Sequence, residues 1–364
     1  MKRVGRALPV LIAGLLGLAL AASAAGTTAA SGTKVRHLQT AVGALAIDGS
    51  RIAYDAGSRY ATHPQANKVL VWNLRTGKTV KVSGKKTASA DTSSTGSGVF
   101  QLALAGTRVA WLVNVGGNLE GDDYLFTSSV TMPKEHQVAS AIRTGDGCPG
   151  RSFSHCAGPW LGGVVGSGNL IAANRWTTDG NGVVTAGQLD VLSGTKLKAV
   201  ATGANTVEAA AADGGRVAVL RADGGVALYS AAGKPLLTVN PPGAEAVALS
   251  GKSLLVGTTT RQLKLYNAHT GSLRKIFSVR GNRPPRALDV QGNVLVYTTG
   301  NAGELHAVNL STGKDRVIAK PHGGIEFAEM DSVGLVYADN GSGTSFGKAT
   351  LVFRPLAAVE AAVR

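Results

Sequence analysis

Residues 287–297 read ALDVQGNVLVY, a run of small and apolar residues that is interrupted by one glycine turn and then continues as a second apolar run. Short alternating runs around a turn predict two antiparallel strands joined by a tight hairpin. Six further copies of this phrase occur along the chain, at residues 44–54, 101–111, 162–173, 209–219, 246–256 and 327–337. One structural unit is therefore repeated seven times.

The turn residues of the seven copies give the period of the repeat. They are Gly49, Gly106, Ser167, Gly214, Gly251, Gly292 and Ser332, so successive turns lie 57, 61, 47, 37, 41 and 40 residues apart. A period near about 40 residues built from short strands is typical of one blade of a β-propeller. We expect an all-β, seven-bladed β-propeller with four antiparallel strands per blade, and a count of six or eight blades is the alternative.

Each copy except the last is followed by two further runs that supply the outer half of a blade. The clearest examples are VLVWNLRTGKTVKV (69–82), LKLYNAHTGSLRKIF (263–277) and LHAVNLSTGKDRVIA (305–319). Asn and Gly in the turns provide the positive backbone angles that a tight hairpin needs. In the last copy, residues 349–353 supply a third strand, and the fourth comes from residues 357–363 or from residues 34–38. We favour residues 34–38, because that strand closes the ring and removes an exposed sheet edge.

These outer hairpins resemble those of quinoprotein-like, YVTN-type and WD-repeat propellers. The shared pattern is an apolar strand that ends in an aromatic or small residue and is followed by Asn and Thr-Gly, and the resemblance covers nearly the whole chain after residue 33. The chain lacks the Trp-Asp pair and the recurring Gly-His of WD repeats, and it lacks the regular Trp-bearing blades of quinoprotein dehydrogenases. The resemblance therefore implies the fold but no reaction, and we expect no cofactor.

The first 25 residues have the three parts of an export signal. Lys2, Arg3 and Arg6 form a basic start, residues 8–22 an apolar core, and Ala22-Ser23-Ala24 a small-residue cleavage site. A retained N-terminal anchor is the alternative. We expect residues 26–33 to be a flexible segment and residues 34–364 to form a single propeller domain. The protein is then secreted or associated with the cell envelope.

The formal net charge of +15 bears on the partners. Excess positive charge attracts a protein to anionic polymers or lipid head groups with a strength that salt reduces. Export argues against nucleic acid, so the expected partner is a protein or an anionic envelope polymer, with peripheral membrane contact as an option and a monomeric state. The basic residues near the outer hairpin turns have one of two roles. They form a docking surface, or they are solvated charges that prevent the outer strands from pairing with other chains. They are Arg75, Lys78, Lys81, Lys196, Lys198, Lys234, Arg274, Lys275, Lys314 and Arg316.

Two cysteines, Cys148 and Cys156, lie close together in the segment CPGRSFSHC. In an exported chain such a pair predicts a local disulfide loop. The alternative is a metal site that also uses His155, but no fourth ligand lies at zinc-like spacing. We expect a disulfide and no metal.

Antiparallel order assigns every connection to one of two faces. The links between second and third strands and the links between blades share a face, and they are long around blades one to three, at residues 55–68, 83–98, 114–123, 141–160 and 174–187. Long loops on a rigid scaffold are where binding and catalytic residues tend to lie. The candidate ligand-binding residues on these loops are Tyr60, His63, Asn118, Glu120, Asp122, Asp123, Arg175, Trp176 and Asp179.

The composition of these loops suits a sugar or peptide ligand, because it combines aromatic rings, carboxylates and an arginine. The alternative is that the loops are surface decoration, with Trp176 packed under its own loop. The acidic knot of Glu120, Asp122 and Asp123 is too local for the carboxyl separation of about 5 to 10 Å that glycosidases use, and it lacks a calcium-loop pattern.

No catalytic residue is predicted. The seven histidines have no metal spacing, and neither a nucleophile elbow nor a phosphate loop occurs. We expect a binding or scaffold module, and the alternative is an extracellular hydrolase or lyase with its active site on the loop-bearing face.

Overall fold

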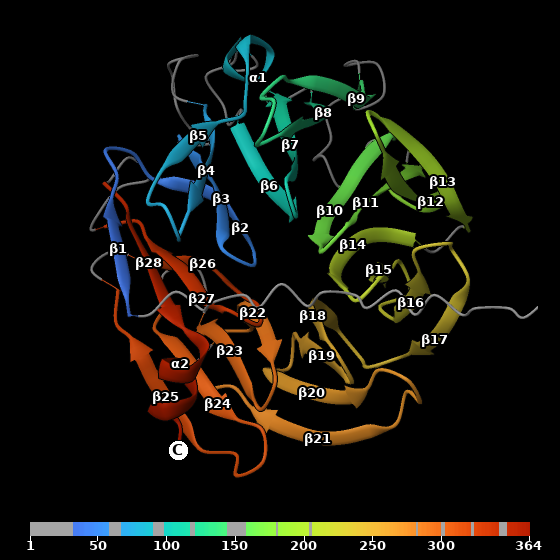
Figure 1. The fold of residues 1–364 in the computed structure, drawn as a ribbon. Helices are drawn as coiled ribbons and strands as arrows, with labels where there is room; N and C mark the ends of the chain where they lie inside the picture. The colour runs from blue at the N-terminus through green and yellow to red at the C-terminus, as the bar shows by residue number, and fades with distance from the viewer. Residues whose placement is uncertain are drawn as a thin grey trace, which may run out of the picture.

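The seven repeats form seven four-stranded antiparallel sheets, which Figure 1 shows arranged in a ring. A central channel lies between their inner strands. The computed structural model describes residues 32–57, 67–89, 98–116, 121–143, 158–179, 181–203, 206–281, 283–299, 303–321, 324–341 and 348–364. Each sheet is one blade, and its first strand lines the channel. The expected seven-bladed propeller is confirmed.

Blades 1 to 3 follow the chain from the channel outwards. Blade 1 is β2 (Val42–Asp48), β3 (Arg51–Ala56), β4 (Val69–Asn73) and β5 (Thr79–Lys81). Blade 2 is β6 (Gly98–Ala105), β7 (Arg108–Gly116), β8 (Gly121–Ser129) and β9 (His136–Ala141). Blade 3 is β10 (Trp160–Ser167), β11 (Leu170–Thr178), β12 (Val184–Ser193) and β13 (Lys196–Thr202).

Blades 4 to 6 have the same order with shorter links. Blade 4 is β14 (Thr206–Asp213), β15 (Arg216–Arg221), β16 (Val226–Ser230) and β17 (Pro235–Val239). Blade 5 is β18 (Ala244–Ser250), β19 (Ser253–Thr258), β20 (Gln262–Asn267) and β21 (Leu273–Ser278). Blade 6 is β22 (Pro285–Gln291), β23 (Val294–Thr299), β24 (Leu305–Asn309) and β25 (Asp315–Ala319).

Blade 7 is built from both ends of the chain. It consists of β26 (Ile325–Met330), β27 (Gly334–Asp339), β28 (Thr350–Pro355) and, as the outermost strand, β1 (Lys34–His37). β1 pairs antiparallel with β28, so that Lys34 lies opposite Phe353 and His37 opposite Thr350. The expected closure by residues 34–38 is confirmed for residues 34–37. Residues 357–363 form no strand, because most of them belong to helix α2 (Leu356–Ala362), which buries Val359 in the core.

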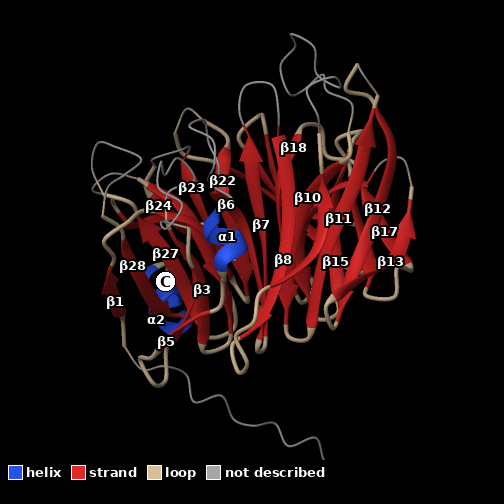
Figure 2. Ribbon diagram, turned by 90° about the horizontal axis from the view of Figure 1, so that it is seen from above, coloured by secondary structure: helices blue, strands red, loops and turns tan. Residues whose placement is uncertain are grey.

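The alternation of strand directions gives the disc two faces, as Figure 2 shows from the side. We call the face with the first-to-second and third-to-fourth strand turns the hairpin face. We call the opposite face, with the second-to-third links and the links between blades, the link face. Gly49, Gly106, Gly251 and Gly292 all sit in turns of the hairpin face.

One link departs from the expected placement on the link face. In the described part of residues 83–98, helix α1 (Lys85–Ser89) lies on the outer flank of the disc (Figure 2). Glu135 from the β8–β9 turn accepts hydrogen bonds from the amides of Gly84, Lys86 and Thr87 at 2.8 to 3.2 Å. The buried Thr87 hydroxyl in turn accepts the indole N–H of Trp111 at 2.9 Å. This segment therefore fastens the side of blade 2 instead of enlarging the link face.

The outer hairpins owe their shape to an asparagine and a glycine. Asn73, Asn267 and Asn309 end the third strands of blades 1, 5 and 6. Each asparagine Oδ1 accepts the amides of the residues two and three positions later, at 2.9 to 3.3 Å. The glycine four positions later then turns the chain with φ near 70° to 78°, which other residues rarely adopt. The Asn and Thr-Gly pattern is thus a folding signal.

Blades 3 and 4 approach each other more closely than side chains would allow. An added Cβ at Gly163 would lie 1.9 Å from the Ala209 carbonyl oxygen, and one at Gly162 would lie 2.3 Å from that of Val207. The buried Asn174 Oδ1 bridges the two inner strands by accepting the amides of Gly163 (3.0 Å) and Ala209 (2.6 Å). The Gly-Gly pair in the third repeat therefore has a packing reason.

Apolar side chains fill the spaces between neighbouring blades. The cluster between blades 1 and 2, for example, contains Val69, Val99, Trp111 and Phe126. Within the ranges given above, no helix is both long and apolar enough to span a membrane.

Deleting residues 34–38 tests the closure. The deletion exposes the β28 edge and removes the β1 contacts, including the packing of Leu38 on the core of blades 7 and 1. We expect the midpoint of thermal unfolding to fall by several degrees and aggregation to increase, measured by calorimetry and light scattering. A chain lacking only residues 26–32 is the control and should unfold like the parent. Equal stability of the parent and the shorter chain would contradict this role of β1.

Candidate functional site

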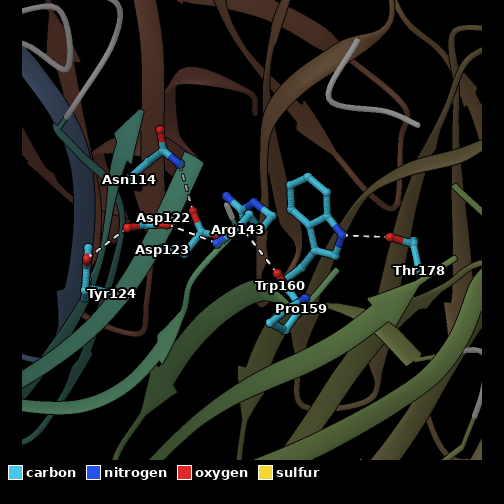
Figure 3. Close-up of polar contacts among 8 residues, drawn as sticks. All are labelled: Asn114, Asp122, Asp123, Tyr124, Arg143, Pro159, Trp160 and Thr178. Carbon is cyan, nitrogen blue, oxygen red and sulfur yellow. Dashed lines mark hydrogen bonds and ion pairs between the residues drawn. The ribbon is translucent and has the colours of Figure 1, made fainter. Parts of the chain in front are cut away.

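The junction of blades 2 and 3 on the link face gathers aromatic and charged side chains (Figure 3). Trp160 and Trp176 lie opposite each other on β10 and β11, and their rings stack with centroids 5.3 Å apart. The Trp160 indole N–H donates to the Thr178 hydroxyl at 2.9 Å, which fixes the ring. Both tryptophans are half-buried.

Arg143 supports this aromatic pair from the side of blade 2. Its guanidinium carbon lies 4.0 Å from the centroid of the Trp160 ring, within the range of a cation–π contact. Its Nη1 makes an ion pair of 2.7 Å with Asp123 and also donates to the Pro159 carbonyl at 3.2 Å. The side chains of Arg143 and Asp123 are only 3% and 6% exposed. Both residues belong to blade 2, and Arg143 reaches blade 3 through Pro159 and Trp160.

The two described members of the acidic knot each have partners. Asp123 accepts the side-chain amide of Asn114 at 2.8 Å besides the Arg143 pair. Asp122 accepts the Tyr124 hydroxyl at 3.1 Å and the backbone amide of Arg143 at 3.0 Å. Burial, and then the neighbouring Asp122 carboxylate, raises the pKa of Tyr124. The knot holds the segment after β9 in place beneath the tryptophans.

Arg175 precedes Trp176 on β11, so its side chain points to the opposite face of the sheet from the tryptophan pair. Its side chain is 45% exposed, and it makes two hydrogen bonds, of 2.8 and 3.0 Å, with the fully buried Asp190. This bidentate geometry fixes the guanidinium plane while one side stays open to water. Asp179 has a different role, because its Oδ1 accepts the amides of Asn181 and Val183 and so closes a turn.

The structure therefore brings together only part of the predicted set. Asp122 and Asp123 bind Arg143, which packs on Trp160, the stacking partner of Trp176. Arg175 points to the opposite face of β11 and pairs with Asp190 instead, and Asp179 follows the end of the same strand. The predicted residues Tyr60, His63, Asn118, Glu120, Cys148 and Cys156 lie outside the described residues. Sequence reasoning missed Trp160 and Arg143, although the position of Trp160 at the start of an inner strand could have signalled the first.

The central channel is a second candidate, a cavity of about 650 Å³ bounded by the inner strands of all seven blades. Eight carboxylates and one cationic side chain, Arg286, line it. The carboxylates are Asp48, Glu208, Asp213, Glu245, Asp289, Glu326, Glu329 and Asp331. An acidic channel thus runs through a chain whose net charge is strongly positive.

Several of these carboxylates join neighbouring blades. Asp48 accepts the Gly106 amide at 2.5 Å, Asp213 accepts that of Gly251 at 2.7 Å, and Asp331 accepts that of Gly49 at 2.6 Å. In each case a side chain at the end of one inner strand binds the hairpin turn of the next blade. These three channel carboxylates therefore have a structural role.

Asp289 and Glu329 form a pair deeper in the channel. Each lies three residues before its turn residue. At the equivalent position the other blades carry Ala46, Ala103, Val165 (three residues before Gly168, where the turn after β10 begins), Ala211 and Ala248. Burial, together with repulsion from Asp331 and Asp213, raises the pKa of Asp289 to about 7, although it accepts the Met330 amide at 2.5 Å. The Glu329 side chain lines the channel, and burial and the charge of Asp289 raise its pKa.

His306 belongs to a buried network in blade 6. Its Nδ1 lies 2.8 Å from Asp315 Oδ1, and its ring stacks on Tyr297 with centroids 4.8 Å apart. The Tyr297 hydroxyl donates to Asp315 Oδ2 at 2.8 Å. Despite burial, the hydrogen bonds from His306 and Tyr297 lower the pKa of Asp315. This network ties the second, third and fourth strands of the blade together.

Several of the predicted basic residues near the outer hairpins contact neighbouring structure. Lys275 donates to the carbonyls of Leu310 and Ser311, at 3.0 Å each, and so links blade 5 to the hairpin of blade 6. Lys314 donates to the carbonyl of Arg364 at the C-terminus. Within the described part of the chain, no group of three or more His, Cys, Asp and Glu side chains is arranged around a metal ion.

Comparison with known proteins supports the fold and gives no information about function. No protein-family model and no curated protein matches the sequence. Among solved structures, the chain is similar to the WD40 β-propeller domain of Doa1, with 12% identity, a TM-score of 0.54, and coverage of 88% of this chain and 96% of that one. It also matches the computationally designed Ika8 protein, at 13% identity and a TM-score of 0.47 over 88% of this chain and 98% of that one.

The raised pKa of Asp289 predicts how stability depends on pH. A carboxyl whose pKa is higher in the folded than in the unfolded state stabilises the fold below the unfolded value of 3.8, and this contribution is lost as the pH rises through about 7. We expect stability to fall between about pH 4 and about pH 7.5, and to fall less in Asp289→Asn, which keeps an acceptor for the Met330 amide. Thermal unfolding across this range measures the slope.

Asp223→Asn is the matched control for this slope. Asp223 is exposed, and the hydrogen bond from Arg221 lowers its pKa, so its titration lies below the range tested. Its removal should leave the slope between about pH 4 and about pH 7.5 unchanged. A slope in Asp289→Asn as steep as that of the parent chain would show that Asp289 does not titrate there.

Proposed function

We propose that this protein is an exported binding module that holds a saccharide-containing, anionic polymer of the cell envelope against the link face of blades 2 and 3. The stacked and partly exposed Trp160–Trp176 pair is the observation that carries the proposal. The β-propeller fold is itself typical of binding and scaffold modules. Export rests on the pattern of residues 1–25.

The tryptophan pair fits a sugar because of its electrostatics. The face of an aromatic ring is electron-rich, and it attracts the weakly positive C–H groups on the flat side of a sugar ring. Hydrogen bonds and buried ion pairs from both blades hold Trp160 and Arg143, so little conformational freedom is lost on binding. The site is thus preorganised.

Arg175 and the overall charge account for the anionic character of the ligand. The Arg175 guanidinium lies across β11 from the Trp176 side chain, at the same end of blade 3, and its side chain is 45% exposed. A carboxylate or phosphate on the polymer would meet a planar donor group there. The net charge of +15 adds a long-range attraction that weakens with salt.

Trp176→Leu tests this site, because leucine still covers Trp160 but offers no aromatic face. We expect binding to purified anionic envelope polysaccharide to weaken by about tenfold, corresponding to about 1.4 kcal/mol, in co-sedimentation. Arg316→Ala is the control, since Arg316 is exposed on the fourth strand of blade 6, away from the site. Binding that persists unchanged in Trp176→Leu, with an unaltered unfolding midpoint, would place the ligand elsewhere.

A hydrolase or lyase is the second candidate, and the Asp289–Glu329 pair favours it. A carboxyl with a pKa of about 7 beside a second one in a cavity is suited to general acid–base chemistry. If the channel is catalytic, Glu329→Gln abolishes release of soluble sugars from the bound polymer while Trp176→Leu only raises the substrate concentration required. If the parent chain releases no soluble sugar, the hydrolase or lyase is rejected and only the binding function is retained.

A further inference from the structure

Two polar side chains are fully buried without partners at the link-face end of blade 1. Asp55 lies near the end of β3, and Asn67 lies two residues before β4; both have a relative exposure of 0%. Neither carboxylate oxygen of Asp55 and neither the oxygen nor the nitrogen of the Asn67 amide has a hydrogen-bond partner. Buried polar groups are nearly always paired, so this pair of residues requires an explanation.

Strand register places both side chains on the same face of the blade. Asp55 lies opposite Val69, and the Ala56 amide donates to the Lys68 carbonyl at 2.8 Å, so Gly57 follows opposite Asn67. Because side chains alternate along a strand, Asn67 shares the face of Asp55, and Lys68 between them points away. The burial of Asn67 and the exposure of Lys68 agree with this alternation.

That face is turned towards blade 2, and backbone oxygens gather on it. The Cβ position of Gly43 on β2 lies 2.8 Å from Asp55 Oδ2, 3.1 Å from the Val99 carbonyl oxygen and 3.5 Å from the Gly57 carbonyl oxygen. Val99 belongs to β6 of blade 2, whereas Gly43 and Gly57 belong to blade 1. Glycine at position 43 leaves room for oxygens from the end of β3 and from β6 to converge.

The other buried aspartates show that Asp55 is an exception. Asp123 is paired with Arg143, Asp190 with Arg175, and Asp339 accepts the Gly341 amide. Among the buried aspartates in the described ranges, only Asp55 has neither oxygen paired. Burial raises its pKa well above the usual range, and the nearby Lys68 amide, which does not reach hydrogen-bond geometry, offsets this only in part. A proton or a cation must compensate the charge.

The chemistry of the surrounding groups favours a cation. A carboxylate, a side-chain amide oxygen and two backbone carbonyls form an all-oxygen set, which hard cations such as Ca²⁺ prefer to softer metals. Backbone carbonyls and carboxylates are the usual calcium ligands, and the flexible coordination of Ca²⁺ tolerates an irregular cage better than Mg²⁺ does. One carboxylate alone implies weak binding, on the order of 10⁻⁴ to 10⁻³ M.

We propose that Asp55, Asn67 and the carbonyl oxygens of Val99 and Gly57 form a calcium site that joins blades 1 and 2 at the link face. The cation neutralises Asp55 and connects an outer position of blade 1 to the inner strand of blade 2. Because the ligands come together only in the folded protein, calcium stabilises the fold by mass action.

The full chain, stripped with a chelator and exchanged into choline chloride, is titrated with CaCl₂ at neutral pH while thermal unfolding is followed. We expect the unfolding midpoint of the parent chain to rise with calcium, MgCl₂ and NaCl to have smaller effects, and Asp55→Asn to show no rise. Asn67→Ala removes a side chain without a partner, so it should fold and yet bind calcium at least tenfold more weakly. Tb³⁺ luminescence sensitised by tryptophan gives direct binding curves for the same variants.

The acidic channel is the rival calcium site, and Glu329→Gln controls for it. That variant should keep the full calcium response if the site lies at Asp55. A response that Glu329→Gln loses and Asn67→Ala keeps overturns the proposal in favour of the channel. The absence of any calcium or sodium response in the parent chain, together with greater stability of Asp55→Asn at neutral pH, overturns it in favour of a protonated Asp55.

Discussion

Carboxylates at the ends of inner strands bind the backbone amides of the next blade, and the arrangement of the ring depends on these bonds. Asp331 binds the turn of blade 1, Asp48 that of blade 2, and Asp213 that of blade 5. Apolar contact alone leaves neighbouring sheets free to slide, whereas a charged acceptor on a fixed amide sets their relative height. The cost is that burial, and to a smaller extent the negative charge gathered around one axis, raises the pKa of Asp289 and Asp331.

The repeat made the fold predictable, because each blade is specified by its own short segment. Apolar alternation placed the strands, glycine and asparagine placed the turns, and the need to cover the β28 edge placed β1. The helix α1 was not predictable in the same way. Its position depends on Glu135, which follows it by about fifty residues and caps it across a blade boundary.

The candidate site was predictable only where the residues belong to the strands and links themselves. Trp176 and Arg175 were found because their link is long, and Asp122 and Asp123 because they stand together in the sequence. Arg143 and Trp160 were not predicted, because their role depends on a contact between two blades and no local sequence pattern indicates such a contact. The pairing of Asp289 with Glu329 was missed for the same reason, since forty residues separate them and only the ring brings them to one level.

Both the tryptophan site and the Asp55 site lie at blade boundaries in the irregular half of the ring. Blades 4 to 6 have short links, and their neighbours pack through apolar side chains. At the boundary of blades 2 and 3, by contrast, a buried ion pair replaces part of this packing, and at that of blades 1 and 2 an unpaired carboxylate does so. These two junctions thus combine apolar packing with buried polar groups, and both proposed ligand sites lie there.

The pairing of β1 with β28 has a consequence for how the protein reaches its folded state. His37 and Thr350 touch at 3.3 Å although 313 residues separate them. During synthesis or translocation from the N-terminus, β1 emerges early and must wait, unpaired, until nearly the whole chain has followed. Six blades can assemble from local hairpins, but the seventh requires a loop closure over the full domain, so ring closure is expected to be the slow, final step of folding.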